Sequence, residues 1–336
     1  MESTTPKDSK CQRMLQLLAV IAMVILQVPG FLLLAPLTLY LILYTKYWWF
    51  CLMYVAWYST VDKKSCVTGE RRSEWVRSWS WWDYATDYYP LKVVKLPWGK
   101  LDPRRNYLFC YFPHGMLSAS SFLTIATNAT EFGKYFPRHE RYLHTLNLFF
   151  KVPFLRELGL CVGGLDASKE ALVNILSKEG GGYISTLVVG GAQEAYFCKP
   201  GVHKIIYKKR KGFIKIAIMQ GAPLVPVYCF GENELYTQVE VATDSYFHKF
   251  REIIRTKLGF SLIFPIGRKG LLAIIPRRKP LTIVVGEPID VQKTENPTQE
   301  QIDNLHKLFE KKLVELFESQ KRFYLKDHES AHLEIC

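Results

Sequence analysis

The sequence predicts an α/β domain, a mixed sheet with flanking helices, preceded by an N-terminal membrane helical hairpin. Two observations predict this architecture. The chain is almost continuously apolar from Met14 to Tyr44, and from Met14 onward the first acidic residue is Asp62. Beyond Pro97, strand-like apolar runs alternate with helical ones, as is typical of α/β domains. With 336 residues, the chain is long enough for a membrane anchor and one large domain.

The apolar run predicts a hairpin over residues 14–59, with residues 1–13 as an N-terminal tail. A spanning helix needs about 20 apolar residues, and this run is too long for one helix. Pro29-Gly30 and Pro36 interrupt it, so we expect the chain to turn near one of these two points. Lys46, Trp48 and Trp49 then lie at the membrane interface.

Basic residues flank the hairpin on both sides, which predicts that both of its ends lie on the cytosolic face. They are Lys7, Lys10 and Arg13 before it, and Lys63, Lys64, Arg71 and Arg72 after it. A cleaved signal peptide with Met14–Leu26 as its apolar core is the competing interpretation. No small-residue cleavage site follows that core and the apolar run continues far beyond it, so the hairpin is favoured.

Residues 60–100 form an aromatic-rich connecting segment. Its stretch Trp75–Trp82 is dense in tryptophan, and we expect a core or interfacial helix there at least as readily as a ligand-binding role.

Residues 101–325 are expected to form the main domain, followed by a C-terminal tail over 326–336. Short apolar runs bounded by turn residues predict buried strands over Tyr107–Phe112, Tyr183–Val189, Leu224–Phe230 and Leu281–Val285. Apolar residues at helical spacing predict helices from Asp166 or Ser168 to Lys178, over Gly212–Gln220, over Tyr246–Leu258 and from Thr298 to about Gln320.

The charge balance favours an anionic partner. Lysine and arginine outnumber the acids 44 to 31, a formal net charge of +13, which suits a membrane surface or a phosphate-bearing molecule. No nucleic-acid-binding motif accompanies the charge, so we expect no nucleic-acid partner. The eight cysteines include no C-x-x-C pair, which argues against zinc or disulfide frameworks and for a reducing environment.

Several motifs that would identify other enzyme classes are absent from the sequence. The phosphate loop, the dinucleotide fingerprint and the G-x-S-x-G elbow are all missing. His139-Glu140 with His144 resembles a zinc-protease helix, but two histidines five residues apart face about 140° from each other on a helix. We therefore interpret this stretch as a surface segment and expect no metal site.

His114 is the candidate general base. It follows the expected strand Tyr107–Phe112, with Pro113 before it and Gly115 after it, and ligands tend to bind at such carboxyl ends of strands. A neutral imidazole accepts a proton near pH 7, as an alcohol that attacks a thioester requires. A lone histidine is nevertheless more often structural.

Glu194 is the candidate partner of His114. It follows Gly190-Gly191 at the end of another expected strand, and a carboxylate beside an imidazole fixes its tautomer. The amides of Gly190, Gly191 and Ala192, with Gly115, are candidates for holding an oxyanion. The alternative is a glycine turn with a solvated glutamate.

Four consecutive basic residues precede Gly212 and its helix. They are candidates for binding the phosphates of CoA, and a basic face against anionic lipid is an equally good interpretation. These residues are Lys208, Lys209, Arg210 and Lys211.

The chain resembles the type-2 diacylglycerol acyltransferase family, which also contains monoacylglycerol and wax-alcohol acyltransferases. The order and spacing of several short motifs carry the resemblance from the N-terminal hairpin almost to the C-terminus. They include Tyr88–Lys92, Phe112-Pro113-His114-Gly115, the Pro153–Glu157 stretch with Arg156 and Glu157, and Val189–Glu194. The series continues with Arg210-Lys211-Gly212-Phe213, the Phe230–Glu234 stretch with Glu232, Asn233 and Glu234, and Val285–Pro288.

The resemblance implies an acyltransferase-like domain that works at the endoplasmic-reticulum membrane, facing the cytosol, and at lipid-droplet surfaces. It implies acyl-CoA as co-substrate, diacylglycerol or a related neutral lipid as acceptor, membrane lipid as a partner, and neither a metal nor a permanently bound cofactor. His114 takes the place of the catalytic histidine of the family's His-Pro-His-Gly motif, and Glu194 that of its partner. A homo-oligomer stays open.

Two positions depart from the family pattern. Phe112 replaces the first histidine of the His-Pro-His-Gly motif, and Asn128 replaces a usual glutamate. These changes leave three alternatives open: transfer to diacylglycerol, transfer to monoacylglycerol or a long-chain alcohol, and a non-catalytic lipid-binding or scaffolding relative.

Overall fold

The structure is a computed structural model that describes residues 9–27, 29–239, 241–242, 245–258, 262–270 and 273–336. Its centre is a seven-stranded sheet in the order β1-β10-β7-β2-β5-β3-β4. Only β10 runs antiparallel to its neighbour β7, and every other pairing in this sheet is parallel. The expected mixed α/β fold is therefore confirmed. The strands are β1 (Leu91–Lys95), β2 (Tyr107–Phe112), β3 (Glu140–Thr145), β4 (Gly164–Asp166), β5 (Tyr183–Val188), β7 (Leu224–Phe230) and β10 (Leu281–Val285).

The four strands expected from sequence, β2, β5, β7 and β10, all lie inside the sheet with a neighbour on each side. All residues of β2, β7 and β10 are buried, as a sheet covered by helices requires. In the register, Cys110 of β2 lies between Leu187 of β5 and Pro226 of β7. This pairing brings the carboxyl ends of β2, β5 and β7 to one edge of the sheet.

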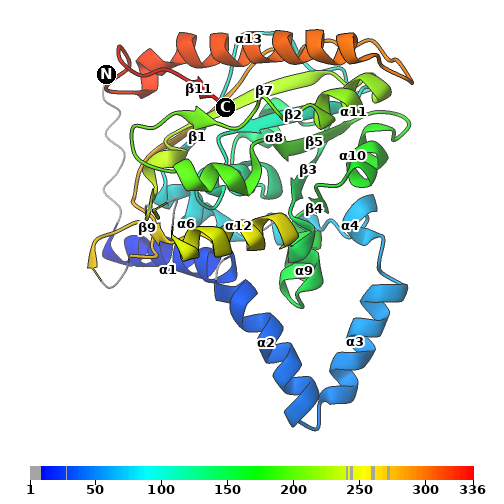
Figure 1. Ribbon diagram of the computed structural model, residues 1–336, viewed down its shortest axis with the longest axis vertical. Helices are drawn as coiled ribbons and strands as arrows, with labels where there is room; N and C mark the ends of the chain where they lie inside the picture. The colour runs from blue at the N-terminus through cyan, green and yellow to red at the C-terminus, as the bar shows by residue number, and fades with distance from the viewer. Residues whose placement is uncertain (1–8, 28, 240, 243–244, 259–261, 271–272) are drawn as a thin grey trace.

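Helices cover both faces of the sheet. One face packs against α10 (Lys169–Leu176), α11 (Gly212–Gln220) and α13 (Gln299–Tyr324), of which α13 runs along the top of Figure 1. Thr298 starts α13 with a capping box, in which its side chain accepts from the Gln301 amide. The other face packs against α1 (Lys10–Gln27), α6 (Ser80–Tyr88), the π-helix η1 (Phe122–Ala126) and α8 (Phe132–Tyr135).

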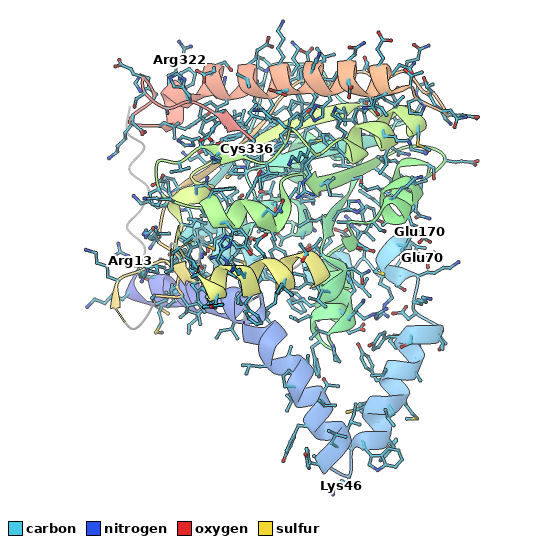
Figure 2. The ribbon with its side chains drawn as sticks, viewed as in Figure 1. Arg13, Lys46, Glu70, Glu170, Arg322 and Cys336 are labelled. Carbon is cyan, nitrogen blue, oxygen red and sulfur yellow. The ribbon has the colours of Figure 1, made fainter. Side chains whose placement is uncertain are left out.

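The hairpin turns later than expected from the sequence. Helix α2 (Pro29–Tyr44) and helix α3 (Trp48–Thr60) form a V that projects away from the domain, with Lys46 at its tip (Figure 2). Pro29 is the first residue of α2, where a proline fits a helix, and Pro36 lies inside α2. The expected turn at Pro29-Gly30 or Pro36 is therefore wrong, because one proline starts a helix and the other is accommodated within it.

Helix α1 differs from α2 and α3 because it packs on the domain. Its buried residues Ala19, Val20, Met23 and Val24 belong to the core cluster that includes Trp82 and Ala85 of α6. By length and composition, α1 is the only helix within the described ranges that is long and apolar enough to cross a membrane; Leu33–Tyr44 is a shorter apolar stretch.

The remaining elements are short, apart from α12 (Tyr246–Leu258). The short helices are α4 (Ser65–Thr68), α5 (Glu74–Arg77), α7 (Ala119–Ser121), α9 (Leu155–Cys161), η2 (Asn147–Lys151), η3 (Gly191–Phe197) and η4 (Glu232–Glu234). Two small sheets pair β6 (Lys204–Ile205) with β11 (Glu334–Ile335), and β8 (Thr237–Gln238) with β9 (Pro265–Ile266). The C-terminal tail is thus paired with the main domain through β11.

Candidate functional site

His114 lies just beyond the carboxyl end of β2 and is partly exposed. Its Nδ1 is 3.0 Å from the carbonyl oxygen of Gly115, so Nδ1–H donates to that carbonyl and Nε2 keeps its lone pair. Burial lowers the pKa of His114 below its usual value, against the opposing effect of the Gly115 carbonyl. The imidazole is therefore neutral at pH 7 and able to accept a proton at Nε2.

Glu194 is buried in η3 and meets the main chain of His114. Its Oε2 accepts from the His114 backbone N–H at 2.6 Å, and its Oε1 accepts from the Ile206 N–H at 2.7 Å. The expected pairing of this carboxylate with the imidazole is replaced by a pairing with the backbone, and the Gly115 carbonyl fixes the tautomer instead. The alternative of a solvated glutamate is wrong, since Glu194 is 2% exposed.

Burial changes the protonation of Glu194. It raises the pKa of this carboxyl to about 7, while the two backbone amides lower it. The group is therefore close to half-ionised at neutral pH, and its charge is most favoured when both amides donate to it.

A second buried carboxylate, Glu232, holds the residues that follow His114. Its Oε1 and Oε2 accept from the backbone amides of Ala119 and Ser120, each at 3.0 Å. Burial raises the pKa of Glu232 to about 7 as well, again opposed by these hydrogen bonds. Residues 114–120 are thus fixed at both ends by buried carboxylates. From the sequence, Glu232 was identified only as one residue of a family motif.

Two glycines make room for the carboxylates. A side chain at Gly190 would overlap the Glu194 carboxylate, and one at Gly115 would meet Glu232 Cγ at 2.5 Å. Gly115 also has φ +59°, a backbone conformation that favours glycine. Gly191, with φ +64°, has open space where its side chain would be, next to Ala192 at the start of η3.

The basic residues before α11 divide into three groups. Arg210 turns to the site, with its guanidinium 2.9 Å from Gln193 Oε1 and 3.3 Å from the Gly190 carbonyl oxygen. Lys211 instead forms an ion pair at 2.7 Å with Asp303 of α13. Lys208 and Lys209 are exposed, and Gly212 begins α11.

Three further motif residues, Pro113, Asn233 and Glu234, have structural roles next to the site. Pro113 is buried between β2 and His114. The side-chain amide of Asn233 donates to the Val202 carbonyl at 2.7 Å, and Glu234 accepts from the Gly201 amide at 2.7 Å. These contacts tie η4 to the loop that leads into β6.

Arg156 and Glu157 lie away from His114. Arg156 is buried and forms ion pairs with Asp62 and with Glu157, the latter at 2.8 Å. Arg71 joins both acids, at 2.8 Å to Asp62 and 2.7 Å to Glu157. This network fastens the end of α3 to α9, so these two motif residues hold the hairpin.

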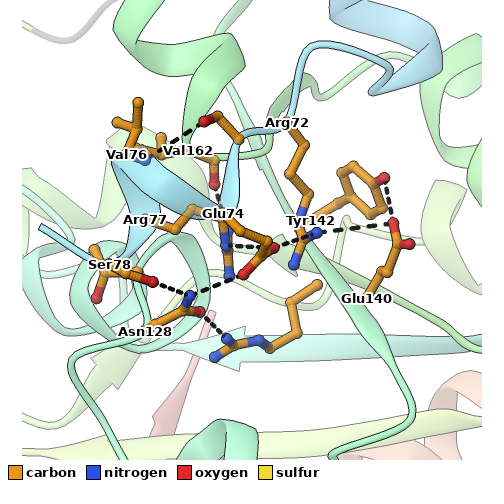
Figure 3. Close-up of polar contacts among 12 residues, drawn as sticks. Arg72, Glu74, Val76, Arg77, Ser78, Asn128, Glu140, Tyr142 and Val162 are labelled. Carbon is orange, nitrogen blue, oxygen red and sulfur yellow. Dashed lines mark hydrogen bonds and ion pairs between the residues drawn. The ribbon is translucent and has the colours of Figure 1, made fainter.

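Phe112 is buried in the core, whereas Asn128 is partly exposed and held by hydrogen bonds. The ring of Phe112 contacts those of Tyr207 and Phe309, with centroids 6.2 and 6.4 Å away. The side-chain amide of Asn128 donates to Glu74 at 2.9 Å and to Ser78 at 2.8 Å, and its oxygen accepts from Arg141 at 2.5 Å (Figure 3). Beside Asn128, the fully buried Arg77 donates to the main-chain oxygens of Val162 and Ile125. Nothing in the sequence indicated this buried arginine.

The interpretation of His139 to His144 as a surface segment is wrong. Residues 140–145 form β3, and His144 is 3% exposed. Its two ring nitrogens lie 2.7 Å from the Asp166 carbonyl oxygen and 2.6 Å from Ser185 Oγ. This strand can be buried despite its polar sequence because its polar side chains have hydrogen-bond partners inside the protein.

A groove of about 530 Å³ borders η3 on the side of α12, within the size range of small-molecule and cofactor pockets. One wall of the groove is lined by Gln193, which precedes Glu194 in the sequence, and by Ile206, whose amide donates to the Glu194 carboxylate. His248, Arg251 and Glu252 of α12 line the other. His114 is outside the groove's lining and is linked to it through Glu194.

The chain is similar to known proteins over most of its length. The family model described as "Diacylglycerol acyltransferase" matches residues 40–335. The bovine (Bos taurus) 2-acylglycerol O-acyltransferase 1 is 42% identical over 85% of each chain. The zebrafish (Danio rerio) diacylglycerol O-acyltransferase 2 is 40% identical over 85% of this chain and 80% of its own. The human (Homo sapiens) acyl-CoA wax alcohol acyltransferase 1 is 39% identical over 88% and 89%.

Proposed function

Because the chain belongs to the diacylglycerol acyltransferase family and is an acyltransferase, we propose that it transfers an acyl group from acyl-CoA to the hydroxyl of diacylglycerol. The product of that transfer is triacylglycerol. The observation that supports this proposal best is the fixed tautomer of His114, which leaves Nε2 as a base on a loop whose main chain the buried Glu194 holds.

The proposed mechanism is direct transfer. His114 Nε2 takes the proton of the acceptor hydroxyl as its oxygen attacks the thioester carbon. Amides at Gly115 and Gly190–Ala192 are candidates to stabilise the tetrahedral oxyanion. The carbon–sulfur bond then breaks, and the CoA thiolate leaves and takes the proton from the imidazolium. No acyl-enzyme forms.

Glu194 positions the base in this proposal. Its hydrogen bond to the His114 amide holds the loop, and its partial negative charge stabilises the imidazolium that forms. Arg210, with the exposed Lys208 and Lys209, is the proposed contact for the CoA phosphates. Lys211 contributes less, since Asp303 already neutralises it.

Monoacylglycerol is the second candidate acceptor, because 2-acylglycerol O-acyltransferase 1 is as similar to the chain as diacylglycerol O-acyltransferase 2 is. A long-chain alcohol is a third, by the same reasoning from acyl-CoA wax alcohol acyltransferase 1. The non-catalytic alternative rests on the two departures from the family pattern, Phe112 and Asn128. Each of these side chains has a structural role, Phe112 in packing and Asn128 in hydrogen bonds, so neither departure by itself argues for loss of activity.

The proposed place of action is the cytosolic face of the endoplasmic reticulum and the surface of lipid droplets. The projecting α2–α3 hairpin supports attachment to a membrane, and the basic residues on both sides of it support a cytosolic domain.

Labelled acyl-CoA offered with diacylglycerol, monoacylglycerol and hexadecanol to the purified chain in lipid nanodiscs tests the proposal. We expect triacylglycerol, and a loss of roughly 10²- to 10⁴-fold in kcat for His114→Ala. Equal rates in wild type and His114→Ala would contradict the base assignment. No ester with any acceptor would favour the non-catalytic alternative.

A further inference from the structure

Helix α12 carries its large apolar side chains on the outside. Tyr246, Phe250 and Ile253 are 90%, 52% and 52% exposed, and their spacing places them on one face of the helix. The opposite face carries His248, Arg251 and Glu252 toward the groove. A helix on a soluble domain has its apolar face inward, so α12 has the reverse arrangement.

One side chain of the inward polar face is firmly held. Arg251 is only 5% exposed, and its guanidinium lies 4.0 Å from the centre of the Tyr196 ring. Rotating α12 to bury Phe250 would bring this buried cation to the surface and break that contact. The outward direction of the aromatic face is therefore built into the fold.

Other apolar side chains are exposed at the same end of the molecule. Helix α12 lies at the level of α1 and α9, the end from which the α2–α3 hairpin projects (Figure 1). Helix α1 exposes Met14 and Leu18, and Phe154 at the start of α9 is 72% exposed. Phe154 also has φ +65°, unusual for a residue with a side chain.

The charge of this end fits a membrane surface. Lys249 is exposed beside the aromatic face of α12, and Arg13 and Lys10 are exposed on α1. Large apolar side chains on one helix face with basic residues beside them are typical of helices that lie in the headgroup region.

We propose that the outer face of α12 lies on the lipid bilayer, so that the groove lined by its inner face opens at the membrane surface. The occupant of this face is the bilayer into which the α2–α3 hairpin inserts, and the proposal rests on the membrane-bound function above. It gives an apolar acceptor a route from the membrane to the η3 side of the active site, without passage through water.

A photo-crosslinking amino acid at two positions tests the contact. p-Benzoylphenylalanine replaces Phe250 on α12 or Phe323 on α13. Phe323 is 60% exposed, and α13 runs along the end of the domain opposite the hairpin (Figure 1). In nanodiscs of phosphatidylcholine and phosphatidylserine, we expect a phospholipid adduct by mass spectrometry at position 250 and none at position 323. Equal adducts at both positions, no adduct at 250, or an adduct to a second protein chain would each overturn the proposal.

A kinetic comparison separates this contact from the chemistry. Phe250→Asp with Ile253→Asp is expected to raise KM for a long-chain acceptor in the bilayer roughly tenfold, with a short-chain, water-soluble acceptor used as before. Phe323→Asp is the matched control and should change neither. Equal loss with both acceptors would contradict the membrane role. A wild type inactive on every acceptor would contradict the proposed function alone, since the crosslink is read without activity.

Discussion

At the scale of single residues, the site depends on glycines that leave room for buried carboxylates. Gly190 and Glu194 lie in one short motif, and the carboxylate occupies the space where a side chain at Gly190 would be. The motif is therefore a packing unit as well as a source of amides, because the glycine lets the carboxylate reach the His114 main chain.

Gly190→Ala should displace the Glu194 carboxylate and free the His114 amide. We expect a fall in kcat of roughly 100-fold and a loss of about 1–3 kcal/mol in stability, the cost of unsatisfied buried groups. Gly212→Ala is the control, because no atom lies within 4 Å of the added carbon. Steady-state kinetics and thermal unfolding measure both variants, and a fully active Gly190→Ala would refute the packing role.

The raised carboxyl pKa values predict a pH dependence of stability. Between about pH 4.5 and 7, the folded chain keeps the proton on Glu232 while the unfolded chain has released it, so stability falls as the pH rises through this window. A shift from 4.5 to about 7 corresponds to about 3 kcal/mol per group.

Glu232→Gln should flatten this slope, because the amide does not titrate. Thermal unfolding in detergent at several pH values from 4.5 to 8 measures it, with Glu329→Gln on the exposed tail as control. The variant will also be less stable at every pH, since an amide has one acceptor for the two amides of Ala119 and Ser120. An unchanged slope would refute the raised pKa of Glu232.

At the scale of elements, the arginine–carboxylate network makes the junction between the hairpin and the domain. Arg156 is the centre of this junction, since it pairs with Asp62 and Glu157 and lies 5.8 and 5.5 Å from the ring centres of Trp57 and Tyr58. Removing one partner of a buried ion pair costs about 3–5 kcal/mol when the other charge is left unpaired. Without Arg156, Asp62 and Glu157 still pair with Arg71, so we expect a cost at the lower end of that range.

Arg156→Met should therefore loosen the end of α3. We expect faster tryptic cleavage at Lys63 and Lys64, just after α3, than in the wild type. Lys134→Met removes an exposed ion pair with Glu131 and should leave the cleavage rate unchanged. Equal cleavage in Arg156→Met and the wild type would show that the hairpin is held by other contacts.

The sequence predicted elements well where apolar pattern and environment agree. The strands β2, β7 and β10 and the helices α11 and α12 have the expected bounds. Strand β3 escaped prediction because Arg141 and His144 are buried with polar partners, which a hydrophobic pattern does not reveal. The meeting of His114 and Glu194 was predictable from strand ends, whereas the backbone as the carboxylate's partner was not, since it depends on the path of η3.

At the scale of the whole molecule, the last residues of the described chain support the basic segment. Strand β11 pairs with β6, and the amides of Tyr207 and Lys208 donate to the Cys336 main-chain oxygen at 2.8 and 2.7 Å. The positions of Lys208, Lys209 and Arg210 thus depend on a strand more than a hundred residues later in the sequence.

Deletion of residues 334–336 should raise KM for acyl-CoA roughly tenfold while kcat changes little. The deletion removes four main-chain hydrogen bonds to residues 203–208, worth about 1 kcal/mol each, and the ion pair of Lys204 with Glu334. The segment that holds Lys208 therefore loses its fixed position. Cys336→Ser keeps the main-chain oxygen and should behave as the wild type. Initial rates over a range of acyl-CoA concentrations, at saturating acceptor, measure the effect. If KM for acyl-CoA stays constant in the deletion variant, the phosphates of CoA bind elsewhere on the basic surface.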